Sequence, residues 1–190
     1  RPGDLVVVDQ FIDRTKGRPS TFFGDGIVGH VEAADPVCPD LSHSLFKAAS
    51  ALDVKVHCNK TLMVMEGPAF STRAESKMHR QLGVDLIGMT AMPEAKLARE
   101  AELCYATLAL ATDYDCWHET EEDVTVDAVI RVIKQNTANA RKVVSILAQT
   151  APSERKCKCK AALEYAVMTD RTVIPRQTAE KMKPIFGRVL

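Results

Sequence analysis

Two carboxylates, two positions apart, are the residues of this chain best suited to chemistry. Asp113 and Asp115 lie in the motif TDYDCW, which directly follows the apolar run Leu103–Ala111. Residues two apart on an extended backbone point to the same side, and strand ends in α/β sheets open into crevices where ligands bind. Such a pair can share a proton, so that one carboxyl donates a hydrogen bond and the other accepts one. This arrangement fits a lone pair beside an amino group, as on the N7 and N6 edge of adenine.

The same two aspartates also have an ordinary structural explanation. Aspartate is common in turns, because its side chain hydrogen-bonds nearby backbone N–H groups. On spacing alone, a solvated turn at a strand end is the more common outcome of such a pattern. Other motifs are needed to choose between the two interpretations.

Four motifs in a fixed order favour the binding site. They are PGDLVVVDQFIDRT at 2–15, EGPAFSTRAE at 66–75, DLIGMTAMPE at 85–94 and TDYDCW at 112–117. Together they resemble the methylthioadenosine phosphorylases, a branch of the trimeric purine nucleoside phosphorylase family. The resemblance runs in order over residues 2–147 and continues more weakly to residue 175.

The resemblance implies roles for the carboxylate motif. Asp113 matches the family residue that protonates or hydrogen-bonds purine N7, Asp115 matches the one that accepts from the 6-amino group, and Thr112 is a further substrate-binding candidate. General-acid assistance of this kind typically contributes about 10²–10⁴-fold to the rate. Relatives that use 6-oxopurines commonly carry Asn in place of the first aspartate, so Asp113 favours adenine. The implied reaction uses phosphate as co-substrate and needs no metal or organic cofactor.

Three more candidates match residues that hold the base and the ribose. Phe70 resembles the aromatic residue that stacks on the base, while Met89 and Thr90 resemble residues at the ribose hydroxyls. Without the motif around it, Phe70 would be interpreted as a core residue. Gly88 stands where the family carries Asn, which alters the local hydrogen bonding.

The predicted start of a long helix matches the pocket for the 5′ substituent. In relatives that use ordinary nucleosides, a His near this point binds the 5′-hydroxyl, whereas Val126 is apolar. Val126, Val129 and Ile130 would give a buried 5′-hydroxyl no hydrogen-bond partner, which would weaken binding by about 1–3 kcal/mol. The same apolar side chains would accommodate a methylthio group. Packing in the core is the alternative role for these side chains. His30 resembles a residue that reaches the neighbouring subunit's 5′ pocket, and its alternative is an ordinary surface position.

The reaction implied is phosphorolysis of 5′-methylthioadenosine to adenine and 5-methylthioribose 1-phosphate by a homotrimer. A general purine nucleoside phosphorylase and a non-catalytic nucleoside-binding subunit stay open as alternatives. The chain opens with Arg-Pro-Gly-Asp and no initiator Met, and nothing in it matches the family's phosphate-binding loop. We therefore expect a preceding segment to supply that loop, so that residues 1–190 are the C-terminal two-thirds of a nucleoside phosphorylase domain.

Composition narrows the class of protein. The 190 residues include 25 basic and 25 acidic side chains, and this balance favours neither a nucleic acid nor an anionic membrane as partner. No apolar run reaches the roughly 18 residues of a membrane span. The six cysteines lie mostly in apolar sequence, which indicates reduced thiols of a cytoplasmic protein, with the nucleus as a second compartment.

The pair Cys157-Lys-Cys159 has three interpretations from its residues alone, and the resemblance adds a fourth that stays open, because family members from hot environments can carry a CxC disulfide near this end. As a metal site it supplies only two of the four ligands of structural zinc, and no partner cluster is evident, so no metal site is predicted. A redox protein built on the pair would need two reactive thiols. We favour the third interpretation, in which two exposed thiols lie by chance at the start of a charged helix.

Strands and helices alternate along the chain, which predicts an α/β fold in a single domain with a mixed, largely parallel central sheet flanked by helices. The predicted strands are Leu5–Val8, a pair within Lys55–Glu66, Val84–Ile87 and Leu103–Ala111. The predicted helices are about 12 residues from Asp40, Arg73–Leu82, one opened by Pro93, Val126–Ala148 after an N-cap at Thr125, and Glu154–Met168 after Ser153.

Overall fold

A mixed four-stranded sheet forms the centre of the fold. The computed structural model describes residues 1–118, 126–152 and 154–190. The strands have the order β3-β2-β1-β4, with β2 parallel to β1 and β3 and with β4 antiparallel to β1. This arrangement confirms the predicted mixed, largely parallel sheet. The bounds are β1 Leu5–Arg14, β2 Val56–Met65, β3 Leu86–Gly88 and β4 Thr107–Leu110.

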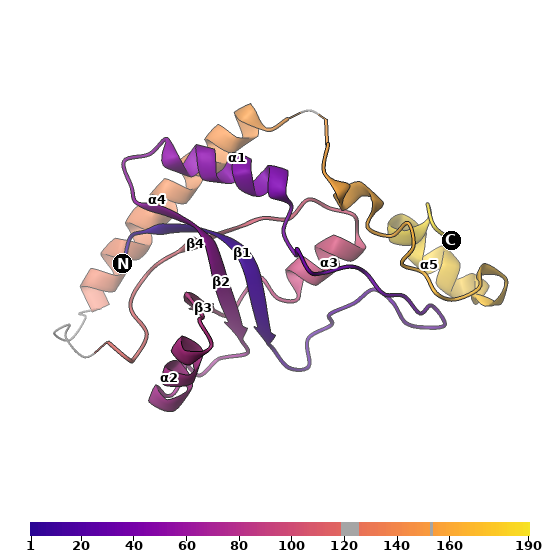
Figure 1. Cartoon of the computed structure of the whole chain (residues 1–190), viewed down its shortest axis with the longest axis horizontal. Coiled ribbons are helices and arrows are strands. Elements are labelled where there is room, and N and C mark those ends of the chain that lie inside the picture. The colour runs from indigo at the N-terminus through magenta and orange to yellow at the C-terminus, as the bar shows by residue number, and fades with distance from the viewer. Residues whose placement is uncertain (119–125, 153) are drawn as a thin grey trace.

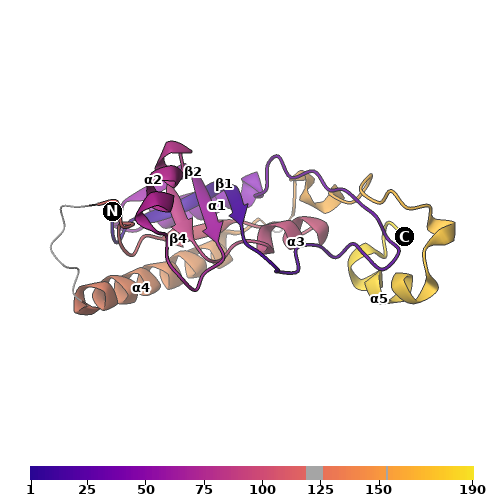
Figure 2. The ribbon, with the colours of Figure 1, turned by 90° about the horizontal axis from the view of Figure 1, so that it is seen from below.

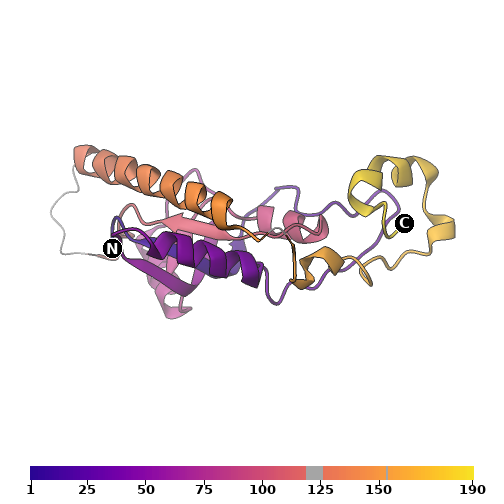
Figure 3. The ribbon, with the colours of Figure 1, turned by 90° about the horizontal axis from the view of Figure 1, so that it is seen from above.

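Helices cover the sheet unequally. The bounds are α1 Pro39–Ser50, α2 Arg73–Gln81, α3 Glu94–Glu100, α4 Val126–Thr150 and α5 Arg176–Phe186, with short 3₁₀ helices η1 Lys158–Ala161 and η2 Arg171–Val173. Helices α1 and α4 lie side by side across one face of the sheet (Figures 1 and 3), while α2 lies on the opposite side. Within the described ranges, no helix has the length and apolar character needed to cross a membrane.

The first half of β1 is buried on both faces. Leu5, Val6, Val7 and Val8 are each 4% exposed or less. Leu5 and Val7 pack against α1 and α4, with Val143 of α4 in the same cluster. Val8 points to the other face and packs with side chains of β2 and α3. The continuous apolar run thus forms a strand covered on both sides, as predicted.

Local signals mark the ends of two helices, and α1 begins one residue before the predicted start at Asp40. Helix α1 spans 12 residues and begins at Pro39, where a missing N–H costs nothing. Helix α2 ends at Gln81, and Gly83 two residues later takes a φ of +74°, the left-handed conformation that favours glycine after a helix.

Several predicted elements differ from the structure. Strand β1 continues beyond the predicted end at Val8 to Arg14, and β3 is Leu86–Gly88 rather than Val84–Ile87. Residues within 55–66 form the single strand β2 rather than a pair, because the ladder to β1 absorbs two register shifts without breaking. Strand β4 is shorter than predicted, since only Thr107–Leu110 pair with β1. The predicted helix Glu154–Met168 is wrong, because this stretch forms only the short helix η1. The helix α5, which contains Pro184, was not predicted. The predicted caps Thr125 and Ser153 lie outside the described residues.

The C-terminal segment builds a second, smaller core away from the sheet. Its centre is Phe186, which is fully buried and stacks on Phe23 with ring centroids 4.7 Å apart. Ile27 and Leu163 belong to the same cluster. The molecule is therefore elongated, with α5 at the end opposite the N-terminus (Figure 2). We call this cluster around Phe186 the outer core.

The expectation of exposed thiols at the CxC pair is wrong. Cys157 and Cys159 are only 7% and 3% exposed, because they pack against Cys38, Cys104 and Leu41. The lysines at 156, 158 and 160 remain exposed and carry the charge outward. All six cysteines are free thiols.

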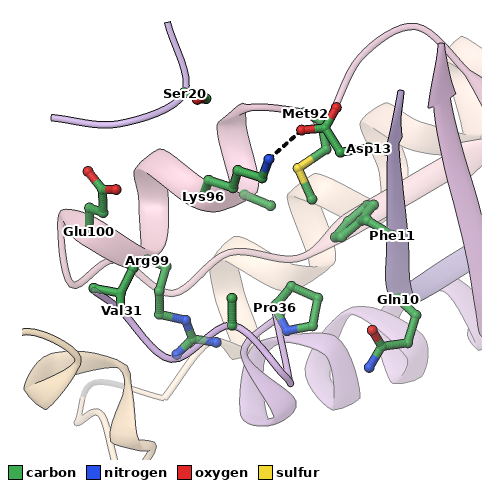
Figure 4. A pocket seen from close by; sticks show the side chains of 12 residues that line it. Gln10, Phe11, Asp13, Ser20, Val31, Pro36, Met92, Lys96, Arg99 and Glu100 are labelled. Atoms are coloured by element: carbon green, nitrogen blue, oxygen red, sulfur yellow. Dashed lines mark hydrogen bonds and ion pairs between the residues drawn. The ribbon is translucent and has the colours of Figure 1, made fainter. Parts of the chain in front are cut away.

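An ion pair ties the end of β1 to α3. Asp13 accepts from Lys96 at the edge of a cavity of about 340 Å³ (Figure 4), and it also accepts from Thr15 N at 2.9 Å. Burial opposes ionisation of this carboxyl, but the hydrogen bonds from Lys96 and Thr15 outweigh it and hold its pKa below the ordinary 3.8.

We expect Asp13→Asn to lower the free energy of unfolding by up to about 1 kcal/mol at neutral pH, since the exposed part of Lys96 screens the pair. A lowered pKa means that this stabilisation is present above pH 3.8 and is lost as the pH falls through the folded-state pKa. Urea unfolding of both proteins at several pH values measures the difference. A gap between them that is unchanged in strong acid would contradict the assignment.

Candidate functional site

One large cleft gathers most of the candidate residues. It has a volume of about 930 Å³ and is lined by β2, β3, β4, α2 and the segment that follows β4. Six of the predicted site residues line it: Phe70, Met89, Thr90, Thr112, Asp113 and Asp115. Three of the four sequence motifs, those at 66–75, 85–94 and 112–117, therefore meet at this cleft, and the motif at 2–15 supplies none of its lining residues.

Antiparallel pairing of β4 places the carboxylate motif. Because Leu110 pairs with Leu5, the chain leaves β4 beside the beginning of β1. Ala111 is fixed there from both sides: its carbonyl accepts from Gly3 N at 2.8 Å and from the Asn136 side-chain amide at 2.8 Å. Asn136 is 1% exposed and comes from α4. The two aspartates thus follow a strand end whose position is held by the sheet and by α4.

Asp113 and Asp115 have different surroundings. Asp113 is exposed and accepts from the Thr112 hydroxyl at 3.1 Å. Asp115 is half-buried, and its Oδ1 accepts from Cys116 N at 2.8 Å. Its Oδ2 is buried and has no hydrogen-bond partner among the described residues. Leaving a buried carboxylate oxygen without a hydrogen-bond donor costs free energy. A ligand that donates a hydrogen bond to this oxygen would remove that cost.

The opposite wall of the cleft presents an aromatic ring and a thioether. Phe70 is 83% exposed, so its ring is available for stacking on a planar ligand. Met89 lies against Gly67, where an added Cβ would come within 2.7 Å of its Sδ. Arg18 joins the two segments that carry Phe70 and Met89. Its guanidinium donates to Met89 O at 3.0 Å and to Glu66 O at 3.0 Å.

Helix α2 completes the cleft. It begins with a capping box, in which Thr72 Oγ1 accepts from Glu75 N and the Glu75 carboxylate accepts from Thr72 N. Its residues Ser76 and His79 are buried in the cleft wall. Arg80 lies over the Trp117 ring, 4.0 Å from its centroid, which fastens the end of TDYDCW to the helix.

Three of the remaining candidates, Val129, Ile130 and His30, are not among the described residues that line this cleft. Val129 is half-buried and Ile130 is 42% exposed on the first turns of α4. The side chain of Val126 lies outside the described residues. His30 is exposed in the loop that joins the outer core, where its N–H donates to Ala166 O at 2.9 Å.

Three residues that position the site were not predicted. Asn136, Arg18 and Arg80 all act on backbone or rings brought close only by the fold. Asn136 had the clearest signal, because a polar amide in the middle of an apolar helix face needs a partner when buried.

Comparison with known proteins agrees with this geometry. The sequence profile of the phosphorylase superfamily matches residues 1–149. This chain belongs to the phosphorylase superfamily. Among superfamily members, the chain is 54% identical over 187 residues to an S-methyl-5′-thioadenosine phosphorylase of Geobacter sulfurreducens, covering 98% of this chain and 65% of that protein. It therefore spans just under two-thirds of the length of this relative.

Solved structures of the superfamily have the same fold. A methylthioadenosine phosphorylase from an antarctic soil metagenomic library matches with a TM-score of 0.90 and 46% identity, over 97% of this chain and 66% of that one. A double mutant of the adenosine/methylthioadenosine phosphorylase of Schistosoma mansoni, in complex with adenine, matches with a TM-score of 0.79 and 33% identity, over 88% of this chain and 68% of that one.

We expect Thr72→Ala to lower the free energy of unfolding by about 1 kcal/mol, because it removes the hydroxyl that caps α2. Thr72→Ser keeps the hydroxyl and is the matched control, with a loss of a few tenths at most. Urea denaturation of the two variants and the parent protein measures both values. Equal losses from Ala and Ser would show that the cap does not hold this helix.

Proposed function

We propose that the complete polypeptide containing this chain catalyses phosphorolysis of 5′-methylthioadenosine to adenine and 5-methylthioribose 1-phosphate. One observation carries the proposal: Asp113 and Asp115 line the same cleft as the exposed Phe70 ring, and Asp115 Oδ2 is buried without a partner among the described residues. Superfamily membership and the names of the relatives support the same reaction.

The proposed chemistry at the base follows from the two carboxyls. A phosphate oxygen forms a bond to C1′ while the C1′–N9 bond breaks and its electron pair leaves with the purine. Asp113 gives its proton to N7, which neutralises the charge developing on the leaving group. Asp115 Oδ2 accepts from the 6-amino group and fixes the orientation of the ring. Stacking on Phe70 removes water from one face of the base.

The sugar end of the proposed substrate is held by less specific contacts. Met89 offers an apolar surface to the ribose, and Thr90 offers a hydroxyl. We propose that Val126, Val129 and Ile130 form the apolar surroundings of the methylthio group, with His30 contributed to a neighbouring subunit's site in a homotrimer. An apolar wall gives a 5′-hydroxyl no partner and so disfavours ordinary nucleosides.

The other reactant and the setting are part of the same proposal. Phosphate is the co-substrate, and the reaction uses no metal or organic cofactor. The residues that bind phosphate are expected in the part of the polypeptide that the relatives have and this chain does not span. The free thiols fit a reducing compartment, so we propose the cytoplasm, with the nucleus as a second location.

Adenine release from methylthioadenosine, with and without phosphate, tests the reaction in the complete polypeptide. We expect phosphate-dependent release, and we expect Asp113→Asn to lower kcat by about 100-fold or more because it removes the acid at N7. Asp53→Asn is the matched control, since Asp53 is exposed and lies outside the cleft lining. Nucleoside binding without phosphate-dependent release would contradict the proposal and favour a non-catalytic nucleoside-binding subunit.

Asp115→Asn tests recognition of the 6-amino group separately from catalysis. We expect the affinity for adenine to fall about tenfold, because the unpartnered carboxylate oxygen is replaced by an amide that accepts less strongly. Purine, which lacks the amino group, is the matched ligand and should bind both proteins equally. Calorimetric titration measures the four affinities. An equal loss for both ligands would point to a general disturbance of the cleft instead.

A further inference from the structure

Four cysteine side chains meet where three distant parts of the chain come together. Cys38 is the N-cap of α1, Cys104 lies between α3 and β4, and Cys157 and Cys159 flank the start of η1. Their four Sγ atoms all lie within 4.8 Å of one another. Three of the residues are buried and Cys104 is half-buried. We call this group the four-cysteine cluster.

The spacing of the sulfur atoms matches a metal centre. Zinc–thiolate bonds of about 2.3 Å in a tetrahedron place the sulfur atoms about 3.8 Å from one another. In the cluster, Cys104 Sγ and Cys157 Sγ are 3.4 Å apart, and no pair exceeds 4.8 Å. The ideal value lies within this range, so small side-chain movements suffice to close the shell around an ion. Tetrahedral sets of four sulfur ligands are typical of zinc.

Two of the sulfur atoms accept hydrogen bonds from outside the cluster. Leu41 N, in the first turn of α1, donates to Cys38 Sγ at 3.5 Å. The Arg99 guanidinium donates to Cys159 Sγ at 3.8 Å. Such outer hydrogen bonds orient thiolate ligands and offset their charge.

Charge balance points the same way. Zinc with four thiolates carries two net negative charges, and basic side chains flank the CxC pair on its exposed side: Arg155, Lys156, Lys158 and Lys160. Ordinary packing of small apolar side chains would explain one or two buried cysteines. It does not explain four buried or half-buried cysteines that converge from three segments next to exposed basic side chains.

We propose a structural Zn²⁺ site with four thiolate ligands: Cys38, Cys104, Cys157 and Cys159. On binding, the four thiols release their protons to solvent as four zinc–sulfur bonds form. A complete tetrahedral shell leaves no open position for a substrate, so the ion acts as a cross-link. It fastens the chain leaving α4, and with it the outer core, to the edge of the α/β sheet.

Metal analysis of the complete polypeptide, purified under reducing conditions without chelators, tests the proposal. We expect about one zinc per chain, and less than about a tenth of that in Cys159→Ser. Cys58→Ser is the matched control, because Cys58 is an exposed thiol on β2 outside the cluster. The control should keep the parent protein's zinc content.

A second measurement covers the case in which Cys159→Ser fails to fold. Parent protein stripped of metal is titrated with Co²⁺, and we expect the intense visible absorption and thiolate charge-transfer band of tetrahedral cobalt–thiolate sites, saturating at one ion per chain. A chelator should also lower the Tm of the parent protein and of Cys58→Ser alike.

Four results would overturn the proposal. These are no bound zinc together with no cobalt–thiolate spectrum, zinc retained in full by folded Cys159→Ser, stoichiometric iron in place of zinc, and cluster cysteines that resist alkylation until a disulfide reductant is added. The last result would mean that the same four thiols form disulfides.

Discussion

The burial of β1 on both faces is the constraint on which the rest of the structure depends. A strand whose alternate side chains all need cover requires a layer on each side, and α1 with α4 supplies one of them. The backbone N–H and C=O groups along its two edges also need partners. Strand β2 pairs with one edge in parallel, and β4 pairs with the other in antiparallel orientation. Because β4 runs antiparallel to β1, the chain leaves β4 beside the start of β1. The carboxylate motif therefore emerges at this end of β1 rather than at its other end.

The cleft is assembled from short segments, each held in place by a residue from another part of the chain. Asn136 fixes the backbone before the aspartates, Arg18 joins the turns that carry Phe70 and Met89, and Arg80 covers Trp117. None of these three needs to touch a ligand to matter. Support of this kind lets loop residues hold a defined geometry, which a site built on irregular backbone otherwise lacks.

The sequence predicts those features that are encoded locally. The run Leu5–Val8, the proline before α3 and the glycine after α2 each carry their structural signal within a few residues. The resemblance to nucleoside phosphorylases also brought Phe70, Met89 and the two aspartates together before their proximity was known. The sequence could not predict that Asp113 is exposed while Asp115 is half-buried, since burial depends on distant segments of the chain.

The errors have the same origin. The helix predicted over 154–168 fails because Cys157 and Cys159 are drawn inward to Cys38 and Cys104, and no pattern in their own neighbourhood marks those partners. Helix α5 was not predicted, and it contains Pro184, a residue that removes one backbone hydrogen bond and does not indicate a helix.

The outer core has a consequence for how the molecule comes apart. Phe186 and its neighbours share few contacts with the sheet, and residues 22–31 belong to this cluster rather than to the central one. We expect such a unit to open before the sheet does, with amide protons that exchange earlier than those of β1. Because the His30 amide is bonded to Ala166, each such opening carries His30 away while the aspartates stay in place. Dislocation of the outer core would thus disable any role of His30 at a neighbouring subunit without unfolding the cleft of its own chain.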